Sequence, residues 1–115
     1  MSEKINITDE KKLLGALGLC ARARKLIFGV PMICEALRRG GDGPIRVVFE
    51  ASDTSENTKK RISDRCRYYN IMHVKLNSDG ETLASAVGKS SAIGAVAVAD
   101  ENMCQLVKSY LTCIE

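Results

Sequence analysis

Short apolar segments alternate with amphipathic helical patterns along this 115-residue chain. Strands are predicted at KLIF (25–28), RVVFEA (46–51) and AVAV (95–98), with a fourth near 72–76. Helices are expected over 8–22, 31–39, 81–87 and 101–113, with a further basic helix that opens at 53–56 and runs to about Tyr69. Alternation at this spacing is typical of α/β domains, in which helices cover both faces of a sheet. The sequence therefore predicts a single domain over 1–115, a three-layer α/β/α sandwich with a small mixed sheet of about four strands.

Two helices carry local signals that bear on packing. Thr8 or Asp9 can cap the first predicted helix, which also contains Gly15 and Gly18. Glycine lowers helix stability relative to alanine, so we expect these two positions to permit close packing against a sheet. The segment DTSE (53–56) matches a capping box, which assigns Asp53 to the cap of the third helix.

Composition narrows the class of protein. Aromatic residues are scarce, with three Tyr, two Phe and no Trp, so the core is expected to be aliphatic. No apolar run approaches the ~20 residues that span a bilayer. The N-terminal segment MSEKINITDEKK lacks the apolar centre of a signal peptide. We therefore expect a cytoplasmic protein with no membrane partner.

The sequence contains no motif that predicts a catalytic or metal-binding site. The chain has five cysteines without a C-x-x-C pair and a single histidine, His73, so zinc is not expected. His73 falls in a predicted strand, where a structural or edge role is favoured. Glu50 lies at a strand end, where α/β proteins often have functional groups, but no nucleophile with a matching base is evident. We expect buried thiols, no enzymatic activity, no cofactor, no metal and no small-molecule substrate.

The stretch from 18 to 40 is strongly basic. Residues 11–40 carry a net charge of +6, whereas residues 76–115 carry −3. A helix opening at Val30-Pro31 would present unpaired backbone N–H groups, which attract anions. The basic residues of this stretch are Arg22, Arg24, Lys25, Arg38 and Arg39. The combination favours a phosphate-rich partner such as nucleic acid over a merely solvated face.

A second basic segment lies in the third predicted helix. Its cations are Lys59, Lys60, Arg61, Arg65 and Arg67. They could contact phosphate, but pairing of Glu56 with Lys60 and of Asp64 with Arg61 would also explain them. The interpretation favoured from sequence is a solvated helix face.

Several segments together are similar to one known family. They are GLCARARKLIFG (18–29), ALRRG (36–40), ASDTSENTKKR (51–61), CRYYNI (66–71), AVGK (86–89) and AVAVAD (95–100). Over about residues 9–112 the chain resembles the L7Ae/L30e ribosomal protein superfamily, and within it the bacterial YlxQ-type branch. The resemblance implies an α/β/α sandwich that binds structured RNA, ribosomal or other, typically at kink-turns.

The resemblance also implies a site. The start of the second helix would enter an RNA groove, and a small loop before the last core strand would pack against an extruded nucleotide. Where the family's archaeal members have Asn, Glu and Lys at this helix start, the chain has Pro31, Met32 and Glu35. Pro31 and Met32 cannot donate side-chain hydrogen bonds to bases, so cations are expected to supply non-specific, salt-dependent affinity. The expected RNA-binding residues are Arg22, Arg24, Lys25, Gly29, Val30, Pro31, Met32, Arg38, Arg39, Lys89, Ser90, Ser91 and Ala92.

Two other interpretations remain open. The chain could be a protein-interaction module that keeps the fold and docks a protein through an exposed apolar patch of Val30, Met32 and Ile33. It could also act in trans as a recognition domain like those attached to RNA methyltransferases. Binding of a kink-turn RNA against a plain duplex discriminates among these functions.

Overall fold

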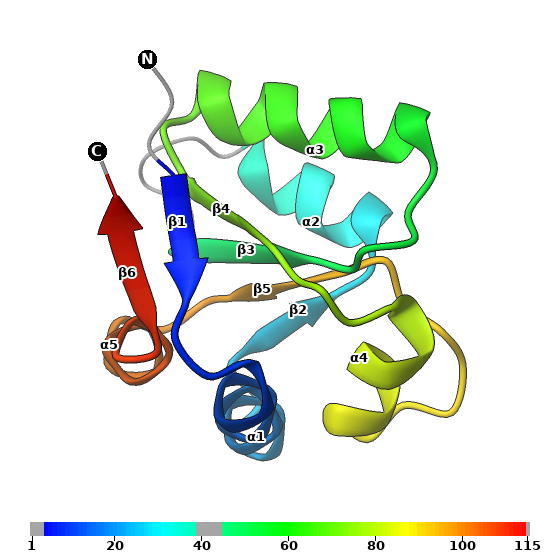
Figure 1. The fold of residues 1–115 in the computed structure, drawn as a ribbon. Coiled ribbons are helices and arrows are strands. Elements are labelled where there is room, and N and C mark those ends of the chain that lie inside the picture. The colour runs from blue at the N-terminus through cyan, green and yellow to red at the C-terminus, as the bar shows by residue number, and fades with distance from the viewer. Residues whose placement is uncertain (1–3, 39–44, 115) are drawn as a thin grey trace.

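A computed structural model describes residues 4–38 and 45–114 (Figure 1). Helices and strands alternate through most of the chain, as the sequence predicts. In chain order they are β1 (Lys4–Ile7), α1 (Glu10–Arg22), β2 (Leu26–Phe28), α2 (Val30–Leu37), β3 (Val47–Glu50), α3 (Glu56–Tyr68), β4 (Met72–Lys75), α4 (Gly80–Ala86), β5 (Ala95–Val98), α5 (Glu101–Lys108) and β6 (Leu111–Ile114).

The central sheet has the strand order β2-β5-β3-β4. Strands β3 and β4 are parallel, and β5 runs antiparallel to both β2 and β3. In Figure 1, α2 and α3 cover one face of this sheet, and α1, α4 and α5 cover the other. The predicted three-layer sandwich with a mixed four-stranded sheet is therefore confirmed.

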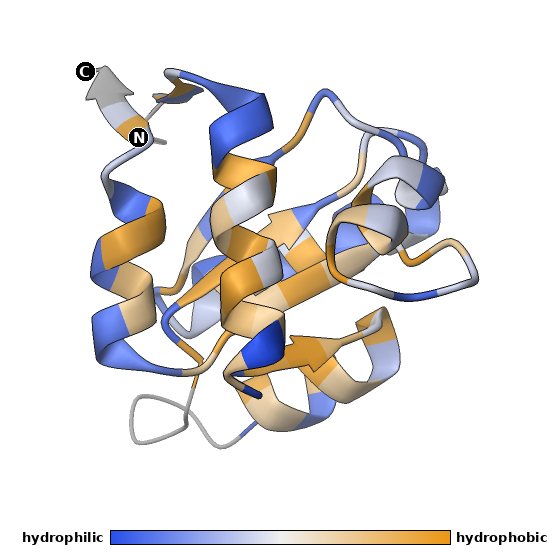
Figure 2. Ribbon diagram, turned by 90° about the horizontal axis from the view of Figure 1, so that it is seen from below, coloured by the Kyte–Doolittle hydropathy of each residue, from blue (hydrophilic) through white to orange (hydrophobic). Residues whose placement is uncertain are grey.

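The side chains of β5 point alternately to the two faces of the sheet. Val96 and Val98 join the apolar cluster beneath α1, α4 and α5, which also contains Phe49, whereas Ala95 and Ala97 join the cluster beneath α2 and α3. All four side chains are buried. A strand buried on both faces appears in sequence as a continuous apolar run, which explains why AVAV was predicted with its observed bounds. Viewed from the α1 side, α1 and α5 show alternating polar and apolar stripes along their ribbons (Figure 2).

A second sheet was missed by the sequence prediction. Strands β1 and β6 pair antiparallel, with Ile7 opposite Leu111. The predicted last helix, 101–113, is wrong beyond Lys108, because Ser109 caps α5 and the chain then reverses into β6. The backbone N–H of Thr8 donates to the carbonyl of Tyr110 at 2.8 Å and closes the end of the two-stranded sheet. This pairing joins segments more than 100 residues apart, so neither strand carries a local signal of its partner.

The two glycines of α1 have different surroundings. Asp9 is the N-cap of this helix, and its side chain accepts a hydrogen bond from the N–H of Lys12 at 3.1 Å. A Cβ built on Gly15 would meet nothing within 4 Å. A Cβ on Gly18 would lie only 2.8 Å from the backbone oxygen of Ala86, in α4. The expectation of close packing against a sheet is therefore wrong: Gly18 permits close contact with a neighbouring helix, and Gly15 is exposed.

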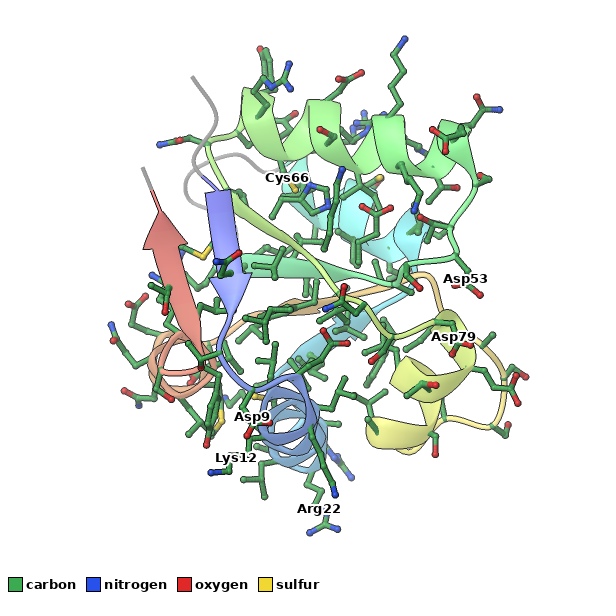
Figure 3. The ribbon with its side chains drawn as sticks, viewed as in Figure 1. Asp9, Lys12, Arg22, Asp53, Cys66 and Asp79 are labelled. Atoms are coloured by element: carbon green, nitrogen blue, oxygen red, sulfur yellow. The ribbon has the colours of Figure 1, made fainter. Side chains whose placement is uncertain are left out.

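Helix α3 begins differently from the prediction. Ser55 is its N-cap, and the side chain of Ser55 accepts from the N–H of Thr58 at 3.2 Å. Asp53 instead accepts a hydrogen bond from the N–H of Gly80 at 2.9 Å, so it ties the loop after β3 to the start of α4. Figure 3 shows Asp53 beside this helix start, close to Asp79. The carboxylate was assigned to the wrong helix because the partner donor lies 27 residues away in the chain.

The cysteines Cys20, Cys34, Cys66 and Cys104 are buried and free, as expected from their apolar positions. Burial and the nearby Cys34 and Glu50 raise the pKa of the Cys66 thiol to about 12. Within residues 4–38 and 45–114 no cluster of His, Cys, Asp and Glu side chains could hold a metal ion. No helix in the same ranges is long and apolar enough to cross a membrane.

Candidate nucleic-acid interface

The start of α2 is an open helix N-terminus. Gly29 is the N-cap with φ 87° and ψ 145°, a left-handed region that favours glycine, and it makes no side-chain cap hydrogen bond. Its own N–H donates to the carbonyl of Ala95 at 3.0 Å, which anchors the turn to β5. Pro31 has no N–H, so Val30 and Met32 supply the backbone donors of this first turn. Pro31 and Met32 are exposed, and the positive end of the helix dipole therefore faces solvent.

The loop 88–94 lies against this helix start. The side-chain amine of Lys89 sits 4.3 Å from the centroid of the Phe28 ring, one residue before Gly29. A Cβ built on Gly94 would lie 3.4 Å from a methyl group of Val30, which shows how closely the loop approaches α2. Lys89, Ser90, Ser91 and Ala92 are all exposed. We call residues 29–32 and 89–92 together the α2–loop surface.

A partly buried hydrogen-bond network around Glu50 holds a loop that packs against the α2–loop surface. Glu50, at the end of β3, is only 1% exposed and lies 2.7 Å from Nε2 of His73. The hydroxyl of Thr54 donates to the other oxygen of Glu50. Lys59 donates to both the carbonyl of Ser52 and the hydroxyl of Thr54, each at 3.0 Å. Together these contacts hold the loop 51–55, whose Thr54 methyl lies 3.1 Å from the Cβ position of Gly94.

The Glu50 carboxylate stays ionised in this setting. Burial alone would raise its pKa, but hydrogen bonds from His73 and Thr54 and the nearby charge of Lys59 outweigh burial and lower the pKa. His73 lies on the edge strand β4, one of the positions that the sequence interpretation favoured, and its ring contacts the Glu50 carboxylate. The role of Glu50 was missed from sequence, although an acidic residue ending a fully apolar strand is the signal for a buried polar network.

Three of the predicted cations lie at the other end of β2. Arg24 has a left-handed backbone, with φ 60°, in the turn between α1 and β2. The amine of Lys25 is 3.9 Å from the carboxylate of Asp100. Lys25 and Gly29 are four residues apart along an extended segment, a separation of about 13 Å. Arg22 ends α1 and lines a groove of about 460 Å³ between α1 and α4; it projects from the side opposite α3 (Figure 3).

Arg38 lies at the other end of α2. It is the C-cap of this helix, and its guanidinium is 3.3 Å from the carboxylate of Glu35. An eight-residue helix is about 12 Å long, so this pair is remote from the helix start. Arg39 lies outside the described residues. Of the cations predicted for the interface and placed by the structure, Lys89 is the one beside the start of α2.

The apolar patch proposed for a protein partner does not exist as predicted. Ile33 is fully buried against the sheet, whereas Met32 is 61% exposed and Val30 is half-buried. In an α-helix neighbouring residues point in directions about 100° apart, so consecutive apolar residues cannot all face solvent. The exposed apolar surface here is therefore Met32 with part of Val30.

Comparison with known proteins places the chain. Residues 11–107 match the Ribosomal protein L7Ae/L30e/S12e/Gadd45 family. The chain belongs to this family. The matched range contains the whole α2–loop surface, the network around Glu50 and all of the four-stranded sheet, so the family fold and the candidate interface coincide.

Individual L7Ae/L30e relatives agree with this assignment. The RNA-binding protein YlxQ of Bacillus subtilis (strain 168) is 32% identical over 95 residues, covering 83% of this chain and 90% of that protein. The RNA-binding protein YlxQ of Enterococcus faecium is 34% identical over 85 residues, covering 74% and 79%.

Solved structures show the same architecture. A protein of unknown function from Bacillus halodurans C superposes with a TM-score of 0.77 at 29% identity, covering 86% of this chain and 95% of that one. A Giardia lamblia 15.5kD RNA binding protein superposes with a TM-score of 0.70 at 16% identity, covering 88% and 82%. The second likeness concerns the fold.

Proposed function

We propose that this protein is a non-catalytic, cytoplasmic RNA-binding protein that holds structured RNA at the α2–loop surface. The observation that carries the proposal is the open N-terminus of α2 with the ammonium group of Lys89 beside it. Backbone N–H groups and a cation on one exposed surface form a phosphate-binding arrangement. The YlxQ relatives, which are named as RNA-binding proteins, support the same function.

The shape of the surface suits an irregular RNA such as a kink-turn. Met32 and Ala92 are exposed apolar groups that can cover an unstacked base, while the glycine at position 29 allows the backbone to approach closely. Pro31 and Met32 offer no side-chain donors to base edges. Recognition therefore rests on RNA shape and phosphate position more than on direct base reading.

The other predicted cations act at a distance. The cations that lie away from the start of α2 are Arg22, Arg24, Lys25 and Arg38. Of these, Lys25 and Arg38 each lie beside a carboxylate. Their contribution is a general attraction for RNA that weakens with salt. The ring of His73 contacts the buried carboxylate of Glu50, so it is not free for acid–base catalysis. This favours RNA binding over an enzymatic function for the protein.

The test compares a kink-turn RNA with a plain duplex of equal length at two salt concentrations. We expect tighter binding of the kink-turn RNA. Lys89→Gln should weaken binding and reduce the steepness of the salt dependence by about one, because one phosphate contact is lost. Lys12→Gln is the matched control, since Lys12 is an exposed cation near the beginning of α1; it removes the same charge away from the α2–loop surface and should weaken binding much less than Lys89→Gln.

The outcomes separate the candidate functions. Equal affinity for both RNAs would indicate a general RNA clamp, and no binding to either would refute the proposal in favour of a protein partner. A triple variant, Arg24→Ala with Lys25→Ala and Arg39→Ala, should flatten the salt dependence. If that variant abolishes binding while Lys89→Gln has no effect, the interface lies away from the α2–loop surface.

A further inference from the structure

Helix α3 has a solvent-facing side whose charged and aromatic residues make no contribution to the packing of the core. It contacts α2 and the sheet through Ile62 and Cys66, which are buried. Figure 1 shows α3 along the outside of the molecule, with α2 and the sheet on its inner side. The outer side is formed by residues at helical spacing, all of them exposed. They are Lys60, Arg61, Asp64, Arg67 and Tyr68, which we call the outer α3 face.

The cations of this face are not neutralised within the helix. Neither Glu56–Lys60 nor Asp64–Arg61 comes within 4 Å, so the pairing expected from sequence is wrong. Among the residues that the structure describes, Lys60, Arg61 and Arg67 have no carboxylate partner at ion-pair distance. The neighbouring Lys59 behaves differently, since it turns inward to the loop 51–55. The charge on the outer α3 face is therefore available to a partner.

An exposed aromatic ring accompanies these cations. Tyr68 is 81% exposed, which is high for a large side chain with no polar anchor in the fold. Its ring meets the ring of Tyr69 edge-on, with centroids 4.8 Å apart and planes at 88°. Most of the Tyr68 side chain remains exposed and can stack on a base. Cations that follow a backbone, combined with an aromatic platform, are what single-stranded nucleic acid requires.

The outer α3 face starts beside the candidate interface. The N-cap Ser55 directly follows Thr54, whose methyl group lies against the Gly94 position of the loop 88–94. From there α3 runs 13 residues, or about 20 Å, to Tyr68. An RNA seated on the α2–loop surface can thus continue along α3.

We propose that the outer α3 face is a second RNA contact, which binds a single-stranded extension of the RNA held at the α2–loop surface. Lys60, Arg61 and Arg67 contact its phosphates, and one unpaired base stacks on Tyr68. Asp64 lies within this face and opposes phosphate binding, so it limits the affinity. The inference rests on the proposed function, because it requires RNA at the first surface.

The test uses one kink-turn RNA with and without unpaired pyrimidine extensions on both strands. Wild-type protein should bind the extended RNA more tightly. Tyr68→Ala should weaken binding of the extended RNA about 5- to 150-fold, the range for loss of one stacked base, and leave the blunt RNA unaffected. Tyr68→Phe keeps the ring and should bind like wild type.

Charge variants probe the same face independently. Combining Lys60→Gln, Arg61→Gln and Arg67→Gln should lower the salt-dependence slope for the extended RNA by about two, from three lost single-strand phosphate contacts. Asp64→Asn removes a like charge and should tighten binding. Circular dichroism and thermal unfolding confirm that each variant is folded.

The two proposals fail in different ways. If wild-type protein binds both RNAs equally, and Tyr68→Ala and the charge variants change nothing, the second contact is refuted while the α2–loop surface stands. If wild-type protein binds neither RNA, both proposals are refuted. If Tyr68→Ala weakens binding of the blunt RNA as much as the extended one, Tyr68 does not read a single-stranded extension, and the second contact is refuted.

Discussion

Alanine at the two glycines of α1 should have opposite effects on stability. In a helix interior, glycine to alanine is favourable by about 0.8–1.0 kcal/mol when nothing else changes. At Gly15 a new methyl group meets nothing within 4 Å, so Gly15→Ala should gain most of this amount. For a domain of this size the gain corresponds to a rise in Tm of about 3–4 °C.

At Gly18 the same methyl group has no room. It would lie 2.8 Å from the backbone oxygen of Ala86, a distance that real Cβ atoms essentially never show. Either α1 or α4 must shift, and overpacking of this kind costs about 1–3 kcal/mol. The helix-propensity gain is common to both variants and cancels in their difference. We therefore expect Gly18→Ala to be less stable than Gly15→Ala by about 1–3 kcal/mol.

Urea unfolding followed by circular dichroism measures both free energies. RNA binding offers a second readout, because Ala86 lies three residues before Lys89. A shift of α4 should disturb the loop 88–92, so Gly18→Ala should also weaken RNA binding while Gly15→Ala leaves it intact. Equal stabilisation by the two substitutions would refute the reasoning, since it would mean that α1 and α4 separate at no cost.

Two further predictions concern titratable groups. Burial would raise the pKa of Glu10, but its hydrogen bonds with Ser78 and Asn77 lower it below 4.5, and the pKa of Glu50 is lowered as well. A carboxylate whose pKa is lowered by folding stabilises the fold at pH values above its ordinary pKa. The free energy of unfolding should therefore fall as the pH drops below about 4.5 and approaches the lowered pKa values of the folded protein. Glu10→Gln and Glu50→Gln should each flatten this dependence in urea titrations between pH 7 and pH 3, and an unchanged profile would contradict the assignment. Cys66, with its pKa of about 12, should react with iodoacetamide at pH 8 far more slowly in folded than in urea-unfolded protein. Mass spectrometry measures the two rates, and equal rates would show that the thiol is accessible.

The core strand β5 and the start of α2 could be predicted from sequence because each is marked by a short run of consecutive residues. The run Ala95–Val98 is buried on both faces, so its apolar character alone identified a strand. The start of α2 was placed within one residue, since glycine and proline mark a helix N-terminus. In both cases the sequence signal lies within a few consecutive residues, although the contacts that bury Ala95–Val98 come from distant segments.

The arrangement of the interface was less predictable, because closeness in sequence does not mean closeness in space. Lys25 and Arg38 lie near Gly29 in sequence, yet a strand and a helix carry them in opposite directions. Lys89 is 60 residues away from Gly29 and still reaches Phe28 beside it. The resemblance to the family, rather than the residue pattern, indicated the loop that contains Lys89.

The two-stranded sheet has a consequence for how this domain is attached to anything else. Pairing of β1 with β6 brings Lys4 opposite Ile114, so both ends of the described chain leave the fold at one place. Figures 1 and 2 both show that place on the side away from the start of α2, in a molecule about 29 Å across. A fluorophore, surface tether or fused domain on either end is therefore attached on the side of the domain away from RNA on the α2–loop surface. Immobilised or labelled protein can thus present this surface unobstructed to long RNA molecules.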